Sequence, residues 1–331
     1  MNDLVSIILP VYNSEKTIKD TVESILKQTY FNFELLIIND GSDDNTDEIC
    51  NLFSDKRIRY FFRKNHGVSN TRNFALNNSK GKYVVFIDSD DLYEKNYLSC
   101  LTDKIKEGYQ LVTCGYSNFG KNRKKFIPKK EHFKNKLDYI AYLQSLFLFN
   151  QIWNKIYLKE IIDYNNIRFD ENLSIAEDWN FNIDYLNKIE KFSIIDSNLY
   201  NYRISSTGLG FKYRNDANEI KLQIVDKMCD YFDCNCTSEF IANSYLKQYF
   251  SYFSNIVDKR NNLSKKEKKD GILNIINMDC YQVRLSKINK LLLKRNLLFI
   301  LLDSRNVNLI YIVSKIANFY DSINKKFKFG L

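Results

Sequence analysis

The sequence predicts an α/β fold with a mostly parallel central sheet flanked by helices, followed by a helical C-terminal domain. Short runs of β-branched and aromatic residues in the first hundred positions are typical of strands buried on both faces. These runs alternate with stretches of helical periodicity, and long helical patterns follow after about residue 215. With 331 residues, 44% of them hydrophobic and 27% charged, the chain has room for two domains.

The expected strands and helices of the first half alternate with short connections. The first strand closes at Pro10, and Ser14 is a candidate N-cap for the helix that follows. We expect strands at 5–9, 33–38, 58–62, 83–87 and 111–116, and helices opening near 15, 44, 68 and 175. This order predicts right-handed crossovers and a mostly parallel sheet.

Three carboxylates, Asp88, Asp90 and Asp91, directly follow the apolar run at 84–87. They therefore lie at the carboxyl end of a buried strand, the edge of an open α/β sheet where ligands bind. Asp88 and Asp90 are two positions apart, and hard divalent cations favour such oxygen ligands. The alternative is a helix cap, since Asp is a preferred N-cap residue before the stretch at 93–98. The position after a buried strand favours a site for a metal ion and a phosphate-bearing ligand.

A dinucleotide-binding domain is excluded by the first turn. That class needs a glycine-rich turn directly after the first strand, because the pyrophosphate must approach the backbone closely. Here residues 10–14 contain no glycine.

Five motifs occur in an order and spacing that match a known family: 5–13 (VSIILPVYN), 39–42 (NDGS), 67–73 (GVSNTRN), 88–91 (DSDD) and 177–179 (EDW). Over about residues 3–205 the sequence resembles family 2 glycosyltransferases of the GT-A fold, of the bacterial surface-polysaccharide type. The resemblance implies an inverting transferase, a hexosyltransferase or N-acetylhexosaminyltransferase, that uses a UDP-sugar with Mn²⁺ or Mg²⁺.

The chemistry of a UDP-sugar site assigns roles to several residues. Asp40 offers an acceptor to the N3–H of uracil, although it is also a common turn residue before Gly41. Arg72, on a helix whose N-terminus suits phosphate, is expected to bind the donor, the alternative being a surface arginine. Asp90 is the expected metal ligand, with Asp88 beside it. The full set expected to bind the nucleotide sugar is Pro10, Tyr12, Asn13, Asp40, Gly41, Arg72, Asp88, Ser89, Asp90 and Arg203.

The acceptor half should lie between residues 93 and 210. Asp178, at a helix start, is the expected general base; the alternative is that it only complements the helix dipole. An ordinary Asp, with a pKa near 3.9, is ionised at neutral pH and ready to take a proton. The acceptor side or the layer behind the site is expected to contain Asp91, Trp153, Lys155, Glu177 and Trp179. Tyr202 and Arg203, followed by 205–208, resemble a mobile lid.

The C-terminal part carries the basic charge of the chain. Residues 259–331 hold sixteen Lys and Arg against five Asp and Glu, a net charge of +11. Its apolar clusters are interrupted by charges, and none approaches the roughly 18 residues of a spanning helix. Two interpretations stay open, a helical domain with a solvated basic face and amphipathic helices on an anionic membrane surface. We expect the domains to be 1–210, divided into a nucleotide-sugar half (1–92) and an acceptor half (93–210), and 211–331.

The predicted function is therefore metal-assisted transfer of a sugar from a UDP-sugar to a glycan or lipid-linked oligosaccharide, in polysaccharide or capsule biosynthesis. No secretory signal precedes the first strand, so we expect a cytoplasmic protein, peripheral on the inner face of the plasma membrane. Seven scattered cysteines suit free thiols. The alternatives are a sugar-nucleotide binding module without turnover and a basic nucleic-acid-binding protein. No nucleic acid is expected as a partner, because the charge lies away from the sheet.

Overall fold

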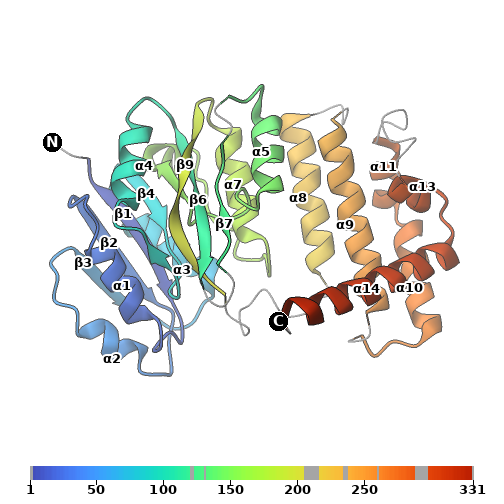
Figure 1. Cartoon of the computed structure of the whole chain (residues 1–331), viewed down its shortest axis with the longest axis horizontal. Helices are drawn as coiled ribbons and strands as arrows, with labels where there is room; N and C mark the ends of the chain where they lie inside the picture. Colours follow the sequence, from blue (N-terminus) through green and yellow to red (C-terminus); the bar gives the residue numbers. More distant parts are fainter. Residues whose placement is uncertain are drawn as a thin grey trace. The chain divides into compact units, whose positions relative to one another are not determined.

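The computed structural model describes residues 3–119, 123–129, 132–204, 216–233, 238–258, 261–287 and 297–329. The chain divides into two compact units, Met1–Tyr213 and Arg214–Leu331 (Figure 1). Unit 1 is an α/β unit built on one sheet, and unit 2 is helical, as the sequence predicts.

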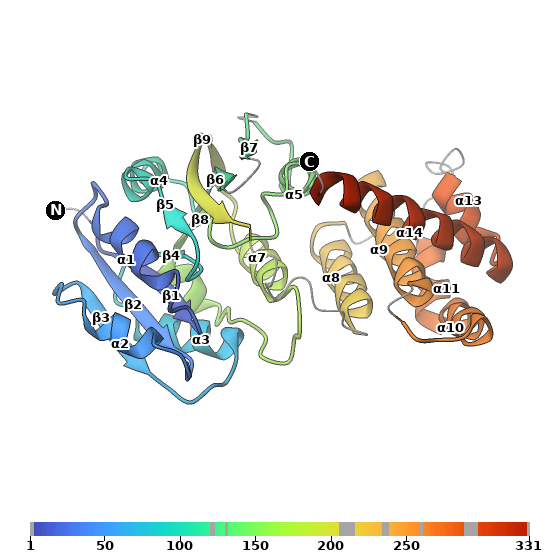
Figure 2. The same ribbon diagram turned by 60° about the horizontal axis from the view of Figure 1, so that its bottom comes forward.

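The sheet of unit 1 has the strand order β3-β2-β1-β4-β8-β6-β9-β5, with β7 paired to β6. The first four strands in this order are parallel, whereas β8 pairs antiparallel with both β4 and β6. All seven residues of β1 and of β2 are buried, because helices cover both faces (Figures 1 and 2). The strands are β1 (Val5–Val11), β2 (Phe33–Asn39), β3 (Ile58–Phe62), β4 (Tyr83–Phe86), β5 (Leu92–Tyr93), β6 (Leu111–Phe119), β7 (Lys125–Phe126), β8 (Lys155–Leu158) and β9 (Phe192–Arg203).

The expected N-cap Ser14 is wrong, because the first helix begins after Thr17 and Ser14 Oγ instead lies 2.7 Å from Ser89 Oγ. The alternative that the carboxylates only cap the next helix does not apply to Asp91, because that helix begins at Tyr97 with Asn96 as its N-cap. The helices of unit 1 are α1 (Ile18–Leu26), α2 (Thr46–Asn51), α3 (Val68–Asn78), α4 (Tyr97–Ile105), α5 (Lys136–Ser145), α6 (Lys159–Tyr164) and α7 (Glu177–Asn187).

A bulge interrupts the parallel pairing of β6 with β9. Cys114 pairs with Ile195, but Gly115 pairs with Asn198 and Tyr116 with Tyr200. Backbone atoms from other parts of unit 1 pack tightly on Gly115. A Cβ atom there would lie 2.4 Å from the carbonyl oxygen of Phe126. Only glycine fits at this point of the bulge.

Unit 2 packs α14 against α9 and α10, and α8 against α9. Its helices are α8 (Ala217–Phe232), α9 (Glu239–Val257), α10 (Lys265–Asn277), α11 (Asp279–Lys287), α13 (Leu297–Asp303) and α14 (Val307–Phe329). Of the described helices, none has the length and apolar character needed to cross a membrane. Cys50, Cys100, Cys114 and Cys280 are free thiols, but Cys229 is disulfide-bonded, so the expectation of free thiols throughout is wrong.

Candidate active site

The loops that follow β1, β2 and β4 meet at the carboxyl edge of the parallel strands. The backbone N–H of Asn13 donates to Ser42 Oγ at 3.0 Å, which joins the first loop to the second. The contact between Ser14 and Ser89 joins the first loop to the carboxylate loop. The site thus has a continuous floor built from three strand ends, where the sequence places Pro10, Tyr12, Asn13, Asp40, Gly41, Asp88, Ser89 and Asp90.

Asp40 fixes the start of α3. Its two carboxylate oxygens accept the backbone N–H groups of His66 and Gly67, each at 2.9 Å. Gly41 has a φ of 75°, and a Cβ atom there would lie 2.8 Å from the backbone nitrogen of Asn65. The turn therefore requires glycine. Tyr12, which directly follows β1, is 50% exposed, so its side chain is accessible to a base.

The three carboxylates after β4 are held in different ways. Asp91 is buried, and its oxygens accept the Tyr200 hydroxyl at 2.6 Å and the Arg203 backbone N–H at 2.7 Å. Burial raises the pKa of Asp91, and the charges of Asp88 and Asp90 raise it further. Burial and the charge of Asp88 also raise the pKa of Asp90. Negative charge is therefore concentrated in this loop beyond what its neighbours balance.

Arg203 ties the end of β9 to the same loop. Its Nε donates to the backbone oxygen of Asp90 at 2.7 Å, and its guanidinium lies 4.7 Å from the ring centre of Phe119. Its side chain is 31% exposed, and Nη2 lies 3.7 Å from the exposed carboxylate of Asp20, so the side chain is within reach of a ligand phosphate. The rest of the expected lid, 205–208, lies outside the described residues.

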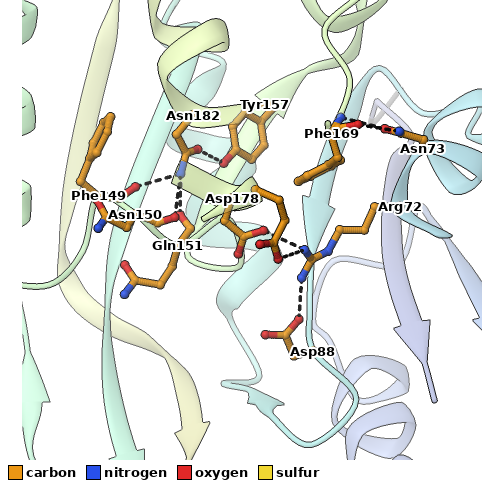
Figure 3. Close-up of polar contacts among 11 residues, drawn as sticks. Arg72, Asn73, Asp88, Phe149, Asn150, Gln151, Tyr157, Phe169, Asp178 and Asn182 are labelled. Carbon is orange, nitrogen blue, oxygen red and sulfur yellow. Dashed lines mark hydrogen bonds and ion pairs between the residues drawn. The ribbon is translucent and has the colours of Figure 1, made fainter. Parts of the chain in front are cut away.

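Arg72 joins the carboxylate loop to α7 (Figure 3). Its Nη2 lies 3.2 Å from Asp88, while Nη1 lies 2.7 Å from Asp178 and 3.2 Å from Glu177. Arg72 is 4% exposed. Burial opposes its charge, but Asp178, Asp88 and Glu177 outweigh that effect and raise the pKa of Arg72. It is therefore not a surface arginine.

Asp178 is the second residue of α7, a helix that starts on a strained turn because its N-cap Ala176 has a φ of 62°. Its carboxylate is mostly buried, with 22% of the side chain exposed, so a small group can still reach it. Burial raises the pKa of Asp178 to about 8 against the attraction of Arg72, and the charges of Glu177 and Asp88 add to the shift. The expectation of an ordinary Asp pKa at this position is therefore wrong.

The loop at 148–154 directs backbone oxygens toward α7, the helix that carries Asp178. Asn182, one turn after Asp178 on α7, donates to the backbone oxygens of Phe149, Asn150 and Gln151 at 2.9–3.3 Å, and its Oδ1 accepts the Tyr157 hydroxyl (Figure 3). These bonds fix the loop to the helix that carries the expected base.

Lys155 holds the same loop from beneath and is completely buried. Its Nζ donates to the backbone oxygens of Leu148 and Gln151 and to Asn154 Oδ1, at 2.7, 2.5 and 2.9 Å. These three acceptors match the three N–H donors of an ammonium group. Burial lowers the pKa of Lys155 to about 7, and Asp178 lies close enough to oppose that shift. Lys155 thus holds the loop at 148–154 from the interior of unit 1.

Aromatic rings line the site next to the carboxylates. Trp153 stacks on Tyr200 and Tyr202, with ring centres 4.2 and 5.6 Å apart. Tyr202 is 38% exposed, and burial with the charges of Asp91, Asp88 and Asp90 raises its pKa to about 12. An exposed ring at this place suits the apolar face of a sugar. Trp179 is buried, and its indole N–H has no partner among the described residues.

The residues present fit a divalent cation shared with a ligand. Among the described residues no group of three or more His, Cys, Asp or Glu could form a metal cage by itself. Mg²⁺ in phosphate-transfer sites, however, is held by one or two carboxylates with substrate phosphates. Asp90 and Asp88 offer those carboxylates, and a cation beside them would offset the burial and the repulsion from Asp88 that raise the pKa of Asp90.

Sequence reasoning missed Tyr200 and Asn182. Tyr200 could have been found from strand alternation, because it is two residues before the expected Tyr202 and shares its face. Asn182 carries a weaker signal, an amide four residues after Asp178 on an otherwise apolar helix face.

Comparison with known proteins finds a family that matches the part of the chain containing most of this site. Residues 6–164 match the family described as Glycosyl transferase family 2. The uncharacterized glycosyltransferase EpsJ of Bacillus subtilis is 29% identical over 218 residues, which cover 63% of each chain. Glycosyltransferase GlyA of Streptococcus pneumoniae is 33% identical over 223 residues, which cover 63% of this chain and 32% of GlyA. The chain thus spans less than two thirds of these relatives.

Among solved structures, S. aureus TarS 1-349 in complex with UDP-GlcNAc has the same fold. Its TM-score is 0.71 at 20% sequence identity, and the match covers 98% of this chain and 92% of that one.

Proposed function

We propose that this chain, a family 2 glycosyltransferase, moves a sugar from a UDP-sugar to a hydroxyl of a glycan or lipid-linked glycan, with inversion at the anomeric carbon. The observation that carries the proposal is the bridge made by Arg72. One guanidinium lies between Asp178, the expected base, and Asp88, in the carboxylate loop. A donor held at that loop therefore has its reacting carbon close to a group that accepts a proton.

A UDP-linked donor is supported by the strand-end floor. Tyr12 has an accessible side chain, Asp40 lies at the base of the same loops, and the side chain of Arg203 is partly exposed. The structural neighbour TarS is described in complex with UDP-GlcNAc, which supports a UDP-hexose or UDP-N-acetylhexosamine.

Asp90, with Asp88 beside it, would hold Mn²⁺ or Mg²⁺ together with the diphosphate. When bound, the cation supplies positive charge that neutralises the leaving nucleotide diphosphate. Arg203, tethered to Asp90, adds a second cation on the same side.

Asp178 is the proposed general base. The acceptor oxygen attacks the anomeric carbon, and its proton passes to the Asp178 carboxylate. The bond between the anomeric carbon and the diphosphate oxygen breaks, and its electron pair leaves with that oxygen. A pKa of about 8 suits this role, because a base is most effective when its pKa lies near the working pH. Tyr202 and Trp153 supply the wall against which an acceptor sugar stacks.

The experiment is a screen of UDP-sugars for UDP release by the purified chain, with Mn²⁺, with Mg²⁺ and after chelation. We expect one sugar class to be turned over only with metal, and Asp90→Ala to abolish both turnover and metal-dependent UDP binding in calorimetry. Asp196→Ala, which changes an exposed Asp of unit 1, is the matched control. UDP binding without turnover of any sugar would indicate a binding module, and unchanged metal-dependent affinity of Asp90→Ala would remove its role as a ligand.

A further inference from the structure

The long helix α14 has apolar residues on two opposite faces. Ile310 and Ser314 are fully buried where α14 packs against α9 and α10, and Asn318 donates to the backbone oxygen of Ser254 at 2.6 Å. Figures 1 and 2 both show α14 lying across the outside of these helices. The inner face of the helix is therefore already used for folding unit 2.

The outward face of α14 carries Leu309, Ile312 and Ile316, which are 44%, 52% and 50% exposed. Single exposed apolar residues are common on proteins, but these three have the spacing i, i+3, i+7 of one continuous stripe. A helix that only covered the core of unit 2 would present polar residues here. Exposing the stripe to water therefore requires an explanation other than folding.

Basic side chains border this stripe. Lys315 on α14 and Lys269 on α10 lie with their Nζ atoms 6.0 and 5.8 Å from the ring centre of Tyr311. Lys269 also donates to Asn308 Oδ1 at 2.5 Å, which places its charge beside the exposed turn. Further along the same helix the sequence adds Lys325, Lys326 and Lys328, within a segment of net charge +11.

We propose that the outward face of α14, formed by Leu309, Ile312 and Ile316, docks the chain on an anionic lipid surface. An apolar stripe edged by lysines is the pattern of a helix that lies in the membrane interface. Acidic lipid headgroups complement the charge of residues 259–331, whereas a second copy of this face would bring like charges together. The proposal goes beyond the transferase activity and does not depend on it.

The test is co-sedimentation of the full chain with vesicles of phosphatidylcholine alone and of phosphatidylcholine mixed with phosphatidylglycerol. We expect binding to the mixed vesicles, lost as salt rises from about 0.1 to about 1 M, because the screening length falls from about 10 to about 3 Å. The double change Ile312→Ser with Ile316→Ser should lower this binding roughly tenfold or more. Both positions are exposed, so the melting temperature should not change.

The matched control is Leu52→Ser with Phe31→Ser, two residues of unit 1 that are 81% and 73% exposed. Its binding should equal that of the wild type. Equal binding to neutral vesicles, or full binding by the α14 double variant, overturns the proposal. Light scattering provides a further arm: a dimer that the α14 variant dissociates, with no vesicle binding by the wild type, would assign the face to self-association instead.

Discussion

Arg72 Nη1 lies 2.7 Å from Asp178 Oδ1, although the two residues are 106 positions apart in the sequence. The other end of the same guanidinium reaches Asp88 at 3.2 Å. The expected base and the carboxylate loop are thus connected through one buried cation. Removing this cation would therefore affect both ends at once.

Arg72→Met should destabilise unit 1 strongly. Removing the cation leaves Asp178, Asp88 and Glu177 close together without a partner, which costs about 3–5 kcal/mol for a buried pair. Tryptophan fluorescence during thermal unfolding measures this, because both tryptophans of the chain lie in unit 1. Lys27→Met, which breaks the surface pair with Glu23, should leave the melting temperature nearly unchanged. Equal effects of the two changes would mean that the Arg72 network is not structural.

Asp178→Asn should separate chemistry from donor binding. The amide keeps the shape of the side chain but does not take a proton, so we expect turnover to fall by about 10²–10⁴, or roughly 3–5 kcal/mol of transition-state stabilisation. UDP affinity should change little, because the base acts on the acceptor hydroxyl. Asp196→Asn is the control at an exposed site. Weakened UDP binding with intact turnover of bound donor would make Glu177 the next candidate.

The pH dependence of turnover should report the raised pKa of Asp178. A base works when deprotonated, so the rate at saturating donor should rise with pH and level off above about pH 8. An ordinary Asp would give a rate that is flat from about pH 5 upward. Because of the same raised pKa, Asp178 binds a proton more tightly in the folded state than in the unfolded state. The stability that Asp178 contributes in this way is therefore lost as pH rises between about 4 and 8. A flat rate profile from pH 5 to 9 would contradict the assignment.

Lys155→Met should change how the stability of unit 1 depends on pH. Burial lowers the folded-state pKa to about 7, below the unfolded value of about 10.4, so the unfolded state binds more protons between these values. Wild-type stability should therefore rise with pH across about 7–10, by at most about 1.4 kcal/mol per pH unit. The variant should lose this slope, in addition to the cost of leaving three acceptors without their donor. Lys27→Met, at an exposed lysine, should retain the wild-type slope. Parallel slopes for Lys155→Met and wild type would show that Lys155 is not the group responsible.

The regular elements of the fold were predictable from local pattern. The strand Ile58–Phe62 and the helix Val68–Asn78 have the predicted bounds, because apolar runs and turn residues mark both ends. The two-residue strands β5 and β7 were missed, since such short segments show no periodicity. Their pairing is set by tertiary neighbours, as for Leu92, which pairs with Asn201.

The site was predictable as a set of positions at strand ends, because parallel strands bring their carboxyl ends to one edge. Its electrostatics were not. The buried environment of Asp178 depends on Arg72, Asp88 and a loop fixed by Asn182, and those contacts span large sequence separations. Likewise, the sequence alone shows Lys155 as a charged residue in a motif, whereas the structure buries it completely and gives it three oxygen acceptors.

The bulge between β6 and β9 makes the length of one short segment critical. On one side of the bulge Thr113 pairs with Ile194, and on the other side Tyr116 pairs with Tyr200. Between these two pairs β9 contains three residues more than β6. Side chains alternate between the two faces of a strand, so an odd offset reverses which residues point to each face. Deleting one residue between Ile195 and Tyr200 would keep the strand but turn Tyr200 and Tyr202 away from Trp153 and Asp91. The spacing of these residues, more than the identity of those between, therefore decides whether the aromatic wall exists.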